Sequence, residues 1–178
     1  MKVMIVSDSH SMSRDKLLAI LKQQKVDYYL HCGDIYMTFD DLPLNNFYNV
    51  RGNNDNRSIK EELTLNIDGL NFWIVHGHKY NVDFNIEGLN DHIKDKNIDV
   101  VCFGHTHRPT YERENNVIFV NPGSLAYPRG RYPNPTYCIF DTSNKQVTFY
   151  DSKTNEVCDP FNIERKKVSI FDIFKRKN

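Results

Sequence analysis

Residues 2–10 read KVMIVSDSH, an apolar β-rich run that is followed at once by polar residues. Residues 15–24 come next and carry leucine and isoleucine at helical spacing, and Ser13 stands where it can cap that helix. A strand followed directly by a helix is the repeating unit of α/β folds. This stretch therefore predicts an α/β domain.

The same alternation continues along the chain. Apolar runs predict further strands, Asp68-Gly69 is a hairpin turn signal, and residues 86–96 place apolar side chains on one helical face. The further strands are expected at residues 28–31, 47–50, 63–67, 70–75, 99–103, 117–120, 137–140 and 147–150. We expect parallel strands with crossovers in the first half and a sheet with hairpins in the second half.

Length and composition limit the function classes. With 178 residues the chain is expected to form one domain, at residues 1–159, followed by a basic and apolar tail at residues 160–178. The tail could be a terminal helix that packs on its own domain, or a segment that docks on a partner or a membrane surface.

The charge balance argues against a polyanion binder. Lys plus Arg and Asp plus Glu both total 23, so no bulk field favours tight nucleic-acid binding. No stretch approaches the roughly 18 apolar residues of a membrane span, so we expect no span and a cytoplasmic location. The cysteines form no CxxC pair and are expected to be free, and the first three of them buried: Cys32, Cys102, Cys138 and Cys158.

Metal-capable side chains follow the predicted strands. They are Asp8, His10, Asp34, Asn53, His76, His105 and His107. In open α/β sheets ligands bind outside the carboxyl ends of the strands, so these residues are expected to converge. Mixed oxygen and nitrogen ligation favours a catalytic site for manganese, iron, zinc or nickel over a calcium or structural zinc site.

Each of these residues also has a structural explanation when taken alone. A single His or Asp at a strand end is more often a capped or hydrogen-bonded residue, and Asn53 lies in a segment of turn composition. Five clusters after five predicted strands make coincidence a poor explanation.

Taken in order, the motifs resemble one family. They are Asp8-Ser9-His10, Gly33-Asp34, Gly52-Asn53-Asn54-Asp55, His76-Gly77-His78, Gly104-His105-Thr106-His107 and Asn121-Pro122-Gly123-Ser124. Over about residues 2–150 the chain resembles the calcineurin-like metallophosphoesterase superfamily, in particular its small YfcE-type phosphodiesterases. The resemblance implies a four-layer α/β/β/α sandwich of two mixed β-sheets flanked by helices.

The resemblance also implies a dinuclear centre. Asp8, His10, Asp34 and His107 would hold the first divalent ion, and Asp34, Asn53, His76 and His105 the second, with Asp34 as the bridge. Manganese is the expected metal, with nickel, iron and zinc as alternatives. Two ions about 3.5 to 4 Å apart permit direct attack of a bridging hydroxide on phosphorus, without a covalent intermediate.

The implied activity is hydrolysis of small phosphodiesters, and the preference for diesters rests on the resemblance alone, as does an expected homodimer. Larger relatives carry a His after the metal-binding Asn, whereas this chain has Asn54, which cannot act as a general acid. Leaving groups that need little protonation should therefore react best.

Several residues around the ligands are candidates for other roles. Asn54, His78 and Arg57 are candidates for substrate contact, although Arg57 could equally be a solvated surface residue. Asp55 is expected to support the loop or to orient a ligand His from behind. A loop that contains Tyr127, Arg129, Arg131 and Tyr132 could shape a substrate pocket, form a dimer contact, or be an ordinary exposed loop.

Two other functions remain open. The first is a non-catalytic, metal-binding scaffold of the same fold that works through protein contacts, as in a eukaryotic retromer subunit; the seven intact ligand positions argue against it. The second is a nuclease, which the neutral charge balance makes a poorer fit. The sequence leaves the physiological substrate and the native metal undecided.

Overall fold

The computed structural model describes residues 1–37, 42, 44–56 and 58–162, and within them the chain forms two five-stranded sheets and two helices. The elements are β1 (Lys2–Val6), α1 (Arg14–Leu21), β2 (Tyr28–His31), β3 (Phe47–Asn49), β4 (Glu62–Ile67), β5 (Leu70–Val75), α2 (Glu87–Ile93), β6 (Val100–Cys102), β7 (Thr110–Glu114), β8 (Val117–Asn121), β9 (Thr136–Asp141) and β10 (Gln146–Asp151).

Both sheets are mixed, as predicted. The first has the order β10-β9-β1-β2-β3, in which β1, β2 and β3 are parallel and β9 and β10 are antiparallel to their neighbours. The second has the order β4-β5-β6-β8-β7, in which β5, β6 and β8 are parallel and the edge strands are antiparallel. Each sheet thus contributes three parallel strands whose carboxyl ends share an edge.

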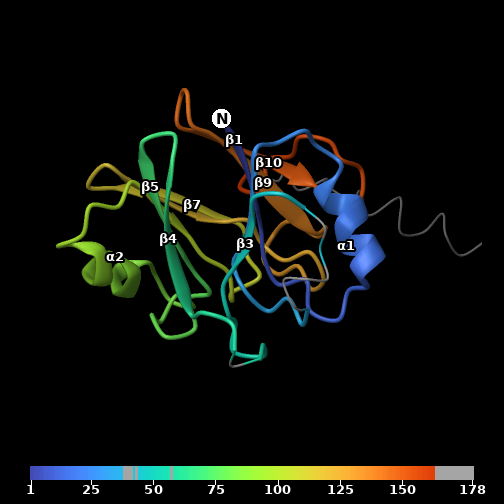
Figure 1. Cartoon of the computed structure of the whole chain (residues 1–178), viewed down its shortest axis with the longest axis horizontal. Coiled ribbons are helices and arrows are strands. Elements are labelled where there is room, and N and C mark those ends of the chain that lie inside the picture. The colour runs from blue at the N-terminus through green and yellow to red at the C-terminus, as the bar shows by residue number, and fades with distance from the viewer. Residues whose placement is uncertain (38–41, 43, 57, 163–178) are drawn as a thin grey trace, which may run out of the picture.

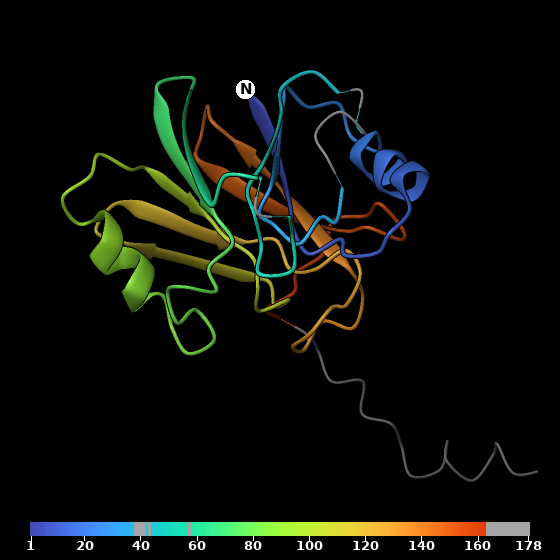
Figure 2. The ribbon, with the colours of Figure 1, turned by 60° about the horizontal axis from the view of Figure 1, so that its bottom comes forward.

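Three hydrophobic clusters separate four layers. In β1, Val3 and Ile5 face the core between the two sheets, whereas Met4 and Val6 face the cluster that includes helix α1. In β5 the alternation repeats, with Phe72 and Ile74 facing inward and Trp73 and Val75 facing α2. The helices lie on opposite outer sides of the two sheets (Figure 1; Figure 2). The predicted α/β/β/α order is confirmed.

Helix α1 begins at Arg14, one residue before the predicted range, and ends earlier than predicted. Ser13 is the N-cap, and its Oγ accepts a hydrogen bond from Lys16 N at 3.4 Å. The helix ends at Leu21 rather than at residue 24, because Gln23 N donates a hydrogen bond to Ile20 O at 3.0 Å, which tightens the last turn. Helix α2 is likewise shorter than the predicted 86–96 range, since Lys96 N bonds Ile93 O at 2.8 Å.

Strand β7 is absent from the sequence-based prediction. It pairs antiparallel with β8 at the edge of the second sheet. Its residues Thr110–Glu114 read TYERE, and four of the five are exposed, so no apolar alternation marks the strand. The sequence analysis missed this strand because it lies at the edge of the sheet, where neither face of the strand needs to be apolar.

The cysteines are free, as predicted, and Cys32, Cys102 and Cys138 are buried. None of the described helices has the length and apolar character needed to cross a bilayer. The division into a domain at residues 1–159 and a tail stays a prediction, and residues 163–178 of the tail lie outside the described residues.

Candidate metal centre

The loops after the parallel strands bring the predicted ligands together. Asp8 and His10 follow β1, Asp34 follows β2, Asn53 follows β3, His76 follows β5, and His105 and His107 follow β6. Two groups of side chains have ligand atoms within 4.8 Å of one another: Asp8 with His10 and His107, and Asp8 with Asp34 and His76. The predicted convergence at the strand ends is what the structure shows.

Left-handed backbone is concentrated at these ligands. Asp8, His10, Asp34, His105 and His107 have φ angles of 52°, 46°, 55°, 70° and 60°. Such angles are uncommon outside glycine, and each costs roughly 1–3 kcal/mol unless the surroundings enforce it. The surrounding fold therefore holds these loops in conformations that they would not adopt alone.

The first group centres on Asp8 Oδ1. This atom lies 3.1 Å from His107 Nε2 and 3.9 Å from His10 Nε2, and the two imidazole nitrogens are 3.2 Å apart. Asp8 is fully buried, and among the described residues no donor makes a well-aligned hydrogen bond to Oδ1. An orphaned buried carboxylate oxygen that faces two imidazole nitrogens fits a bound cation.

The pKa shifts of Asp8 and His107 are consistent with a bound cation. Burial alone would raise the pKa of Asp8, but the contact with His107 and the charges of neighbouring histidines outweigh burial and lower it. Burial alone would lower the pKa of His107, and the Asp8 carboxylate reverses the shift and raises it. Asp8 therefore stays ionised and favours a positive neighbour.

The second group surrounds His76 and Asn53. His76 Nε2 lies 3.6 Å from Asp34 Oδ2 and 4.0 Å from Asp8 Oδ1. Asn53 Oδ1 lies 3.1 Å from His76 Nε2 and 3.2 Å from His105 Nδ1. Asp8 thus belongs to both groups and Asp34 to the second, and the bridging role of Asp34 stays a prediction.

Backbone carbonyls fix two of the imidazole rings. His76 Nδ1 donates to Cys32 O at 2.8 Å, and His107 Nδ1 donates to Tyr127 O at 2.8 Å. In the neutral ring the proton then sits on Nδ1, which leaves the Nε2 lone pair free for a metal ion. Oxygen and imidazole donors of this kind suit manganese, iron, nickel or zinc.

Asp8 is held from several sides by groups to which the sequence analysis assigns no supporting role. Its Oδ2 accepts hydrogen bonds from Ser7 Oγ at 2.6 Å and from His105 N at 3.1 Å. Its backbone oxygen accepts from Ser124 Oγ at 2.8 Å. Asn121 Nδ2 donates to Gly104 O at 2.7 Å, so the Asn121–Ser124 segment supports both sides of the centre. The sequence signal for this support is the Asn121–Ser124 segment, which carries the family resemblance but does not by itself indicate a role.

His31 is a second support that the sequence analysis missed. It is fully buried, its Nδ1 accepts from Gly33 N at 3.2 Å, and its Nε2 donates to Ser9 Oγ at 3.0 Å. Burial lowers the pKa of His31 to about 4, so the ring is neutral near pH 7. It ties the loop after β1 to the loop after β2.

The predicted substrate and support residues lie beside the ligands. Asn54 donates to Asp34 through its backbone N at 2.9 Å and its Nδ2 at 2.7 Å. The His78 ring lies 5.5 Å from the His76 ring, and burial lowers the pKa of His78. Asp55 accepts from Tyr36 N at 2.8 Å and Gly52 N at 2.9 Å, so it links two loops. Their roles stay predictions, and Arg57 lies outside the described residues.

One carboxylate outside the motifs lies close to a predicted ligand. Asp83 Oδ2 lies 3.4 Å from His105 Nε2, on the side of the ring opposite Asn53. Two tyrosines of the loop at residues 127–132 differ in their contacts. The Tyr127 ring lies 5.0 Å from the His10 ring, whereas Tyr132 Oη donates a hydrogen bond to Asp151 Oδ2 at 2.9 Å. Tyr127 therefore borders the metal centre, whereas the Tyr132 hydroxyl is paired with a residue of β10.

Known proteins resemble this chain over most of its length. Residues 1–145 match the model of the calcineurin-like phosphoesterase superfamily domain. A phosphodiesterase of Methanocaldococcus jannaschii is 32% identical over 169 residues, which cover 82% of this chain and 96% of that protein.

Solved structures show the same likeness. A conserved uncharacterized protein of Streptococcus pneumoniae, described as a predicted phosphoesterase, has a TM-score of 0.77 at 27% identity and covers 88% of this chain and 92% of its own. Wild-type Vps29 of Entamoeba histolytica, complexed with zinc, has a TM-score of 0.68 at 22% identity, with coverages of 84% and 91%, and so shares the fold alone.

Proposed function

This chain belongs to the calcineurin-like phosphoesterase superfamily, and from that premise we propose that it is a phosphodiesterase that hydrolyses small phosphodiesters with two divalent metal ions. The observation that carries the proposal is the buried Asp8 Oδ1, which has no aligned donor among the described residues and faces the Nε2 atoms of His10 and His107. The name of the M. jannaschii relative supports the diester preference.

The residues of this chain have separate tasks in the proposed reaction. When bound, the two ions would supply Lewis acidity to the phosphoryl group and lower the pKa of an attacking water molecule. Asn53 offers a neutral oxygen, which limits the negative charge that an approaching phosphodiester anion meets. Asn54 holds Asp34 through two hydrogen bonds and supplies no acid, so a good leaving group is favoured.

The test compares two nitrophenyl substrates. Metal-stripped protein is assayed with bis-p-nitrophenyl phosphate and with p-nitrophenyl phosphate, with manganese added back and a chelator as control. Manganese-dependent cleavage that favours the diester is the expected result, and nickel, iron and zinc are compared with manganese. Preference for the monoester would indicate that the protein is a phosphomonoesterase and not a phosphodiesterase. No turnover with any divalent ion would favour a function as a protein-binding scaffold.

Variants test the proposed ligands. Asn53→Ala and His76→Ala are expected to bring hydrolysis to background without loss of the fold. His92→Gln is the matched control, because this ring stacks on Trp73 at 4.8 Å, away from the metal centre. Near wild-type turnover in either ligand variant would refute the assignment.

The remaining expectations concern the whole molecule. A homodimer and a cytoplasmic location stay predictions, as does the lack of tight nucleic-acid binding. Light scattering that gives the 21.0 kDa mass of one chain would refute the dimer.

A further inference from the structure

The imidazole ring of His10 is contacted by a side chain on its far nitrogen. In His107, the other predicted imidazole ligand of the first ion, Nδ1 donates to the backbone oxygen of Tyr127 at 2.8 Å. In His10, Nδ1 instead lies 3.4 Å from Tyr36 Oη, and the two rings meet edge to face with centroids 5.4 Å apart. His10 Nε2 lies 3.2 Å from His107 Nε2. Tyr36 therefore contacts the nitrogen of His10 that is not next to the predicted metal site.

The Tyr36 hydroxyl can determine which nitrogen of His10 carries the proton. A neutral imidazole binds a metal ion through the nitrogen that has no proton, so Nε2 is available only when the proton sits on Nδ1. The Tyr36 oxygen can accept a hydrogen bond from Nδ1–H, and because Tyr36 is 49% exposed, water can accept the hydroxyl proton. Tyr36 thus favours the tautomer of His10 that can bind a metal ion.

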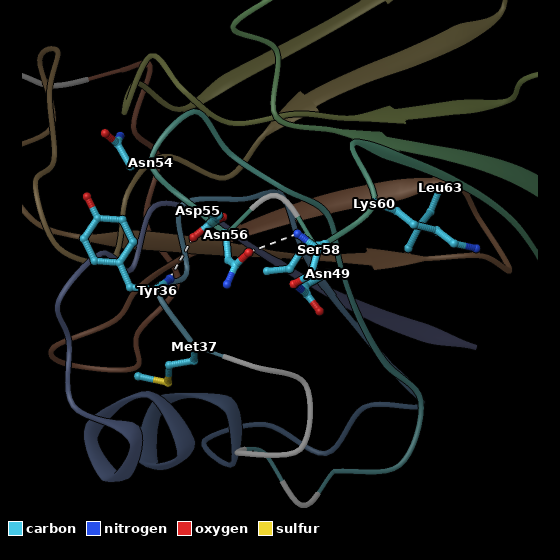
Figure 3. A pocket seen from close by; sticks show the side chains of 10 residues that line it. Tyr36, Met37, Asn49, Asn54, Asp55, Asn56, Ser58, Lys60 and Leu63 are labelled. Atoms are coloured by element: carbon cyan, nitrogen blue, oxygen red, sulfur yellow. Dashed lines mark hydrogen bonds between the residues drawn. The ribbon is translucent and has the colours of Figure 1, made fainter.

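The backbone of Tyr36 is held in an uncommon conformation. Its φ angle of 58° is an outlier for a bulky residue, and such a backbone persists only where its surroundings enforce it. The Tyr36 side chain is too exposed for packing alone to do this. Its backbone N donates to Asp55 Oδ1 at 2.8 Å, a bond drawn as a dashed line in Figure 3, and Asp55 Oδ2 accepts from Gly52 N at 2.9 Å. The Asp55 carboxylate therefore ties Tyr36 to the loop after β3.

The loop after β2 contacts His10 at two points. Asp34 O accepts a hydrogen bond from His10 N at 2.8 Å, and Tyr36 Oη lies next to the His10 ring. Ile35, between these two residues, is 1% exposed and belongs to the hydrophobic cluster that includes α1. A tightly packed residue between the two contacts limits how far they can move relative to each other. The loop can therefore hold both the backbone and the ring of His10.

We propose that Tyr36 is a positioning residue that presets the His10 imidazole for metal binding, with Nδ1–H donating to Tyr36 Oη and Nε2 left free for the first ion. The inference rests on the proposed two-metal site and assigns a task to a residue outside every motif of the sequence. Tyr36 also lines a cavity of about 650 Å³ (Figure 3), so direct contact with the substrate is the rival role. The experiments below separate the two roles.

The first experiment measures the tautomer of His10 in metal-free protein. Long-range ¹H–¹⁵N NMR, at a pH where the ring is neutral, distinguishes a proton on Nδ1 from one on Nε2. We expect the Nδ1–H form to dominate in the wild type and its fraction to fall in Tyr36→Phe, which keeps the ring and removes only the hydroxyl. Tyr111→Phe removes a partly exposed hydroxyl from β7 and should leave the tautomer unchanged. Equal tautomer fractions in wild type and Tyr36→Phe would overturn the inference.

The second experiment measures manganese affinity by calorimetry on metal-stripped protein. Tyr36→Phe should bind manganese about tenfold more weakly than wild type, because a ligand loses the partner that orients it, and Tyr111→Phe should bind as wild type does. Saturating manganese should then restore kcat/KM with bis-p-nitrophenyl phosphate. A loss of kcat/KM that persists at saturating manganese, with unchanged affinity, would assign Tyr36 to the substrate and overturn the inference.

The calorimetric and NMR results do not depend on turnover. If Tyr36→Phe weakens manganese binding and shifts the tautomer, but the wild type cleaves neither nitrophenyl ester, the positioning role stands and only the proposed function fails. If the wild type is an active phosphodiesterase and Tyr36→Phe changes neither the tautomer nor the affinity, the positioning role is wrong and the proposed function stands.

Discussion

The substitution Gly104→Ala tests whether close packing behind the metal centre holds the Asp8 carboxylate in place. Gly104 lies between β6 and His105, and a Cβ atom at this position would overlap Ser7 Oγ and lie 2.8 Å from Asp8 Oδ2. Neither neighbour can give way freely, because Ser7 Oγ donates to Asp8 Oδ2 and both residues are fully buried. The new methyl group must therefore displace the Asp8 carboxylate or break its hydrogen bond.

The magnitude follows from that geometry. Asp8 Oδ2 would have to retreat by about 0.7 Å to reach ordinary contact distance. A shift approaching 1 Å in a catalytic arrangement costs up to about 100-fold in rate, and losing support behind a ligand costs about 10- to 100-fold in metal affinity. Overpacking should also lower the free energy of unfolding by about 1–3 kcal/mol.

The assay measures metal affinity, turnover and stability on the same samples. Manganese binding is followed by calorimetry on metal-stripped protein, kcat/KM is measured with bis-p-nitrophenyl phosphate, and the free energy of unfolding comes from urea denaturation. Gly69→Ala is the control: its φ of +82° makes an alanine strained, but a Cβ there meets nothing within 4 Å. If Gly104→Ala binds manganese as tightly as Gly69→Ala, the argument that this glycine positions Asp8 is wrong.

Three further predictions follow from single contacts. Asp83→Asn should weaken manganese binding about tenfold, because Asp83 Oδ2 lies 3.4 Å from His105 Nε2; unchanged affinity in calorimetry would count against this role. Burial lowers the pKa of His31 to about 4 from 6.5, so the unfolded chain binds more protons between these pH values and stability is lost as the pH falls through them. His31→Gln should therefore remove about 2 kcal/mol of the stability loss between pH 7 and pH 5 in urea denaturation of metal-free protein, and an identical loss in the variant would refute the assignment. Ser13→Ala should lower the free energy of unfolding by about 1 kcal/mol, because the Ser13 cap of α1 is lost, and an unchanged urea midpoint would contradict it.

The predictable part of the fold is the part encoded by local apolar patterns. The run at residues 2–7 contains β1, and residues 70–75 coincide with β5, because both strands are buried on two faces. Strand β7 has exposed side chains and is defined by its pairing with β8, which no local pattern records. The early ends of α1 and α2 likewise depend on turn hydrogen bonds rather than on apolar periodicity.

The convergence of the candidate ligands was predictable because their chemistry is visible at fixed places after the strands. The residues that support them were not, since their partners are distant in sequence. Ser124 reaches the backbone of Asp8 across 116 positions, and Asn121 reaches Gly104 across 17. His31 reads as an ordinary strand residue until the structure shows its bond to Ser9.

The same long-range contacts explain how strained loops can form a site. Asp8 N donates to Gly33 O at 3.0 Å, and His10 N donates to Asp34 O at 2.8 Å, so the loops after β1 and β2 are joined through their backbones. Asp8 and Asp34 both have left-handed φ angles, and each angle is held by bonds that the other loop provides. The two carboxylates are therefore positioned as one unit by the parallel pairing of β1 with β2. Because that pairing is buried in the first sheet, the arrangement of the two carboxylates is a property of the fold itself, and a metal ion would bind to ligands that are already in place.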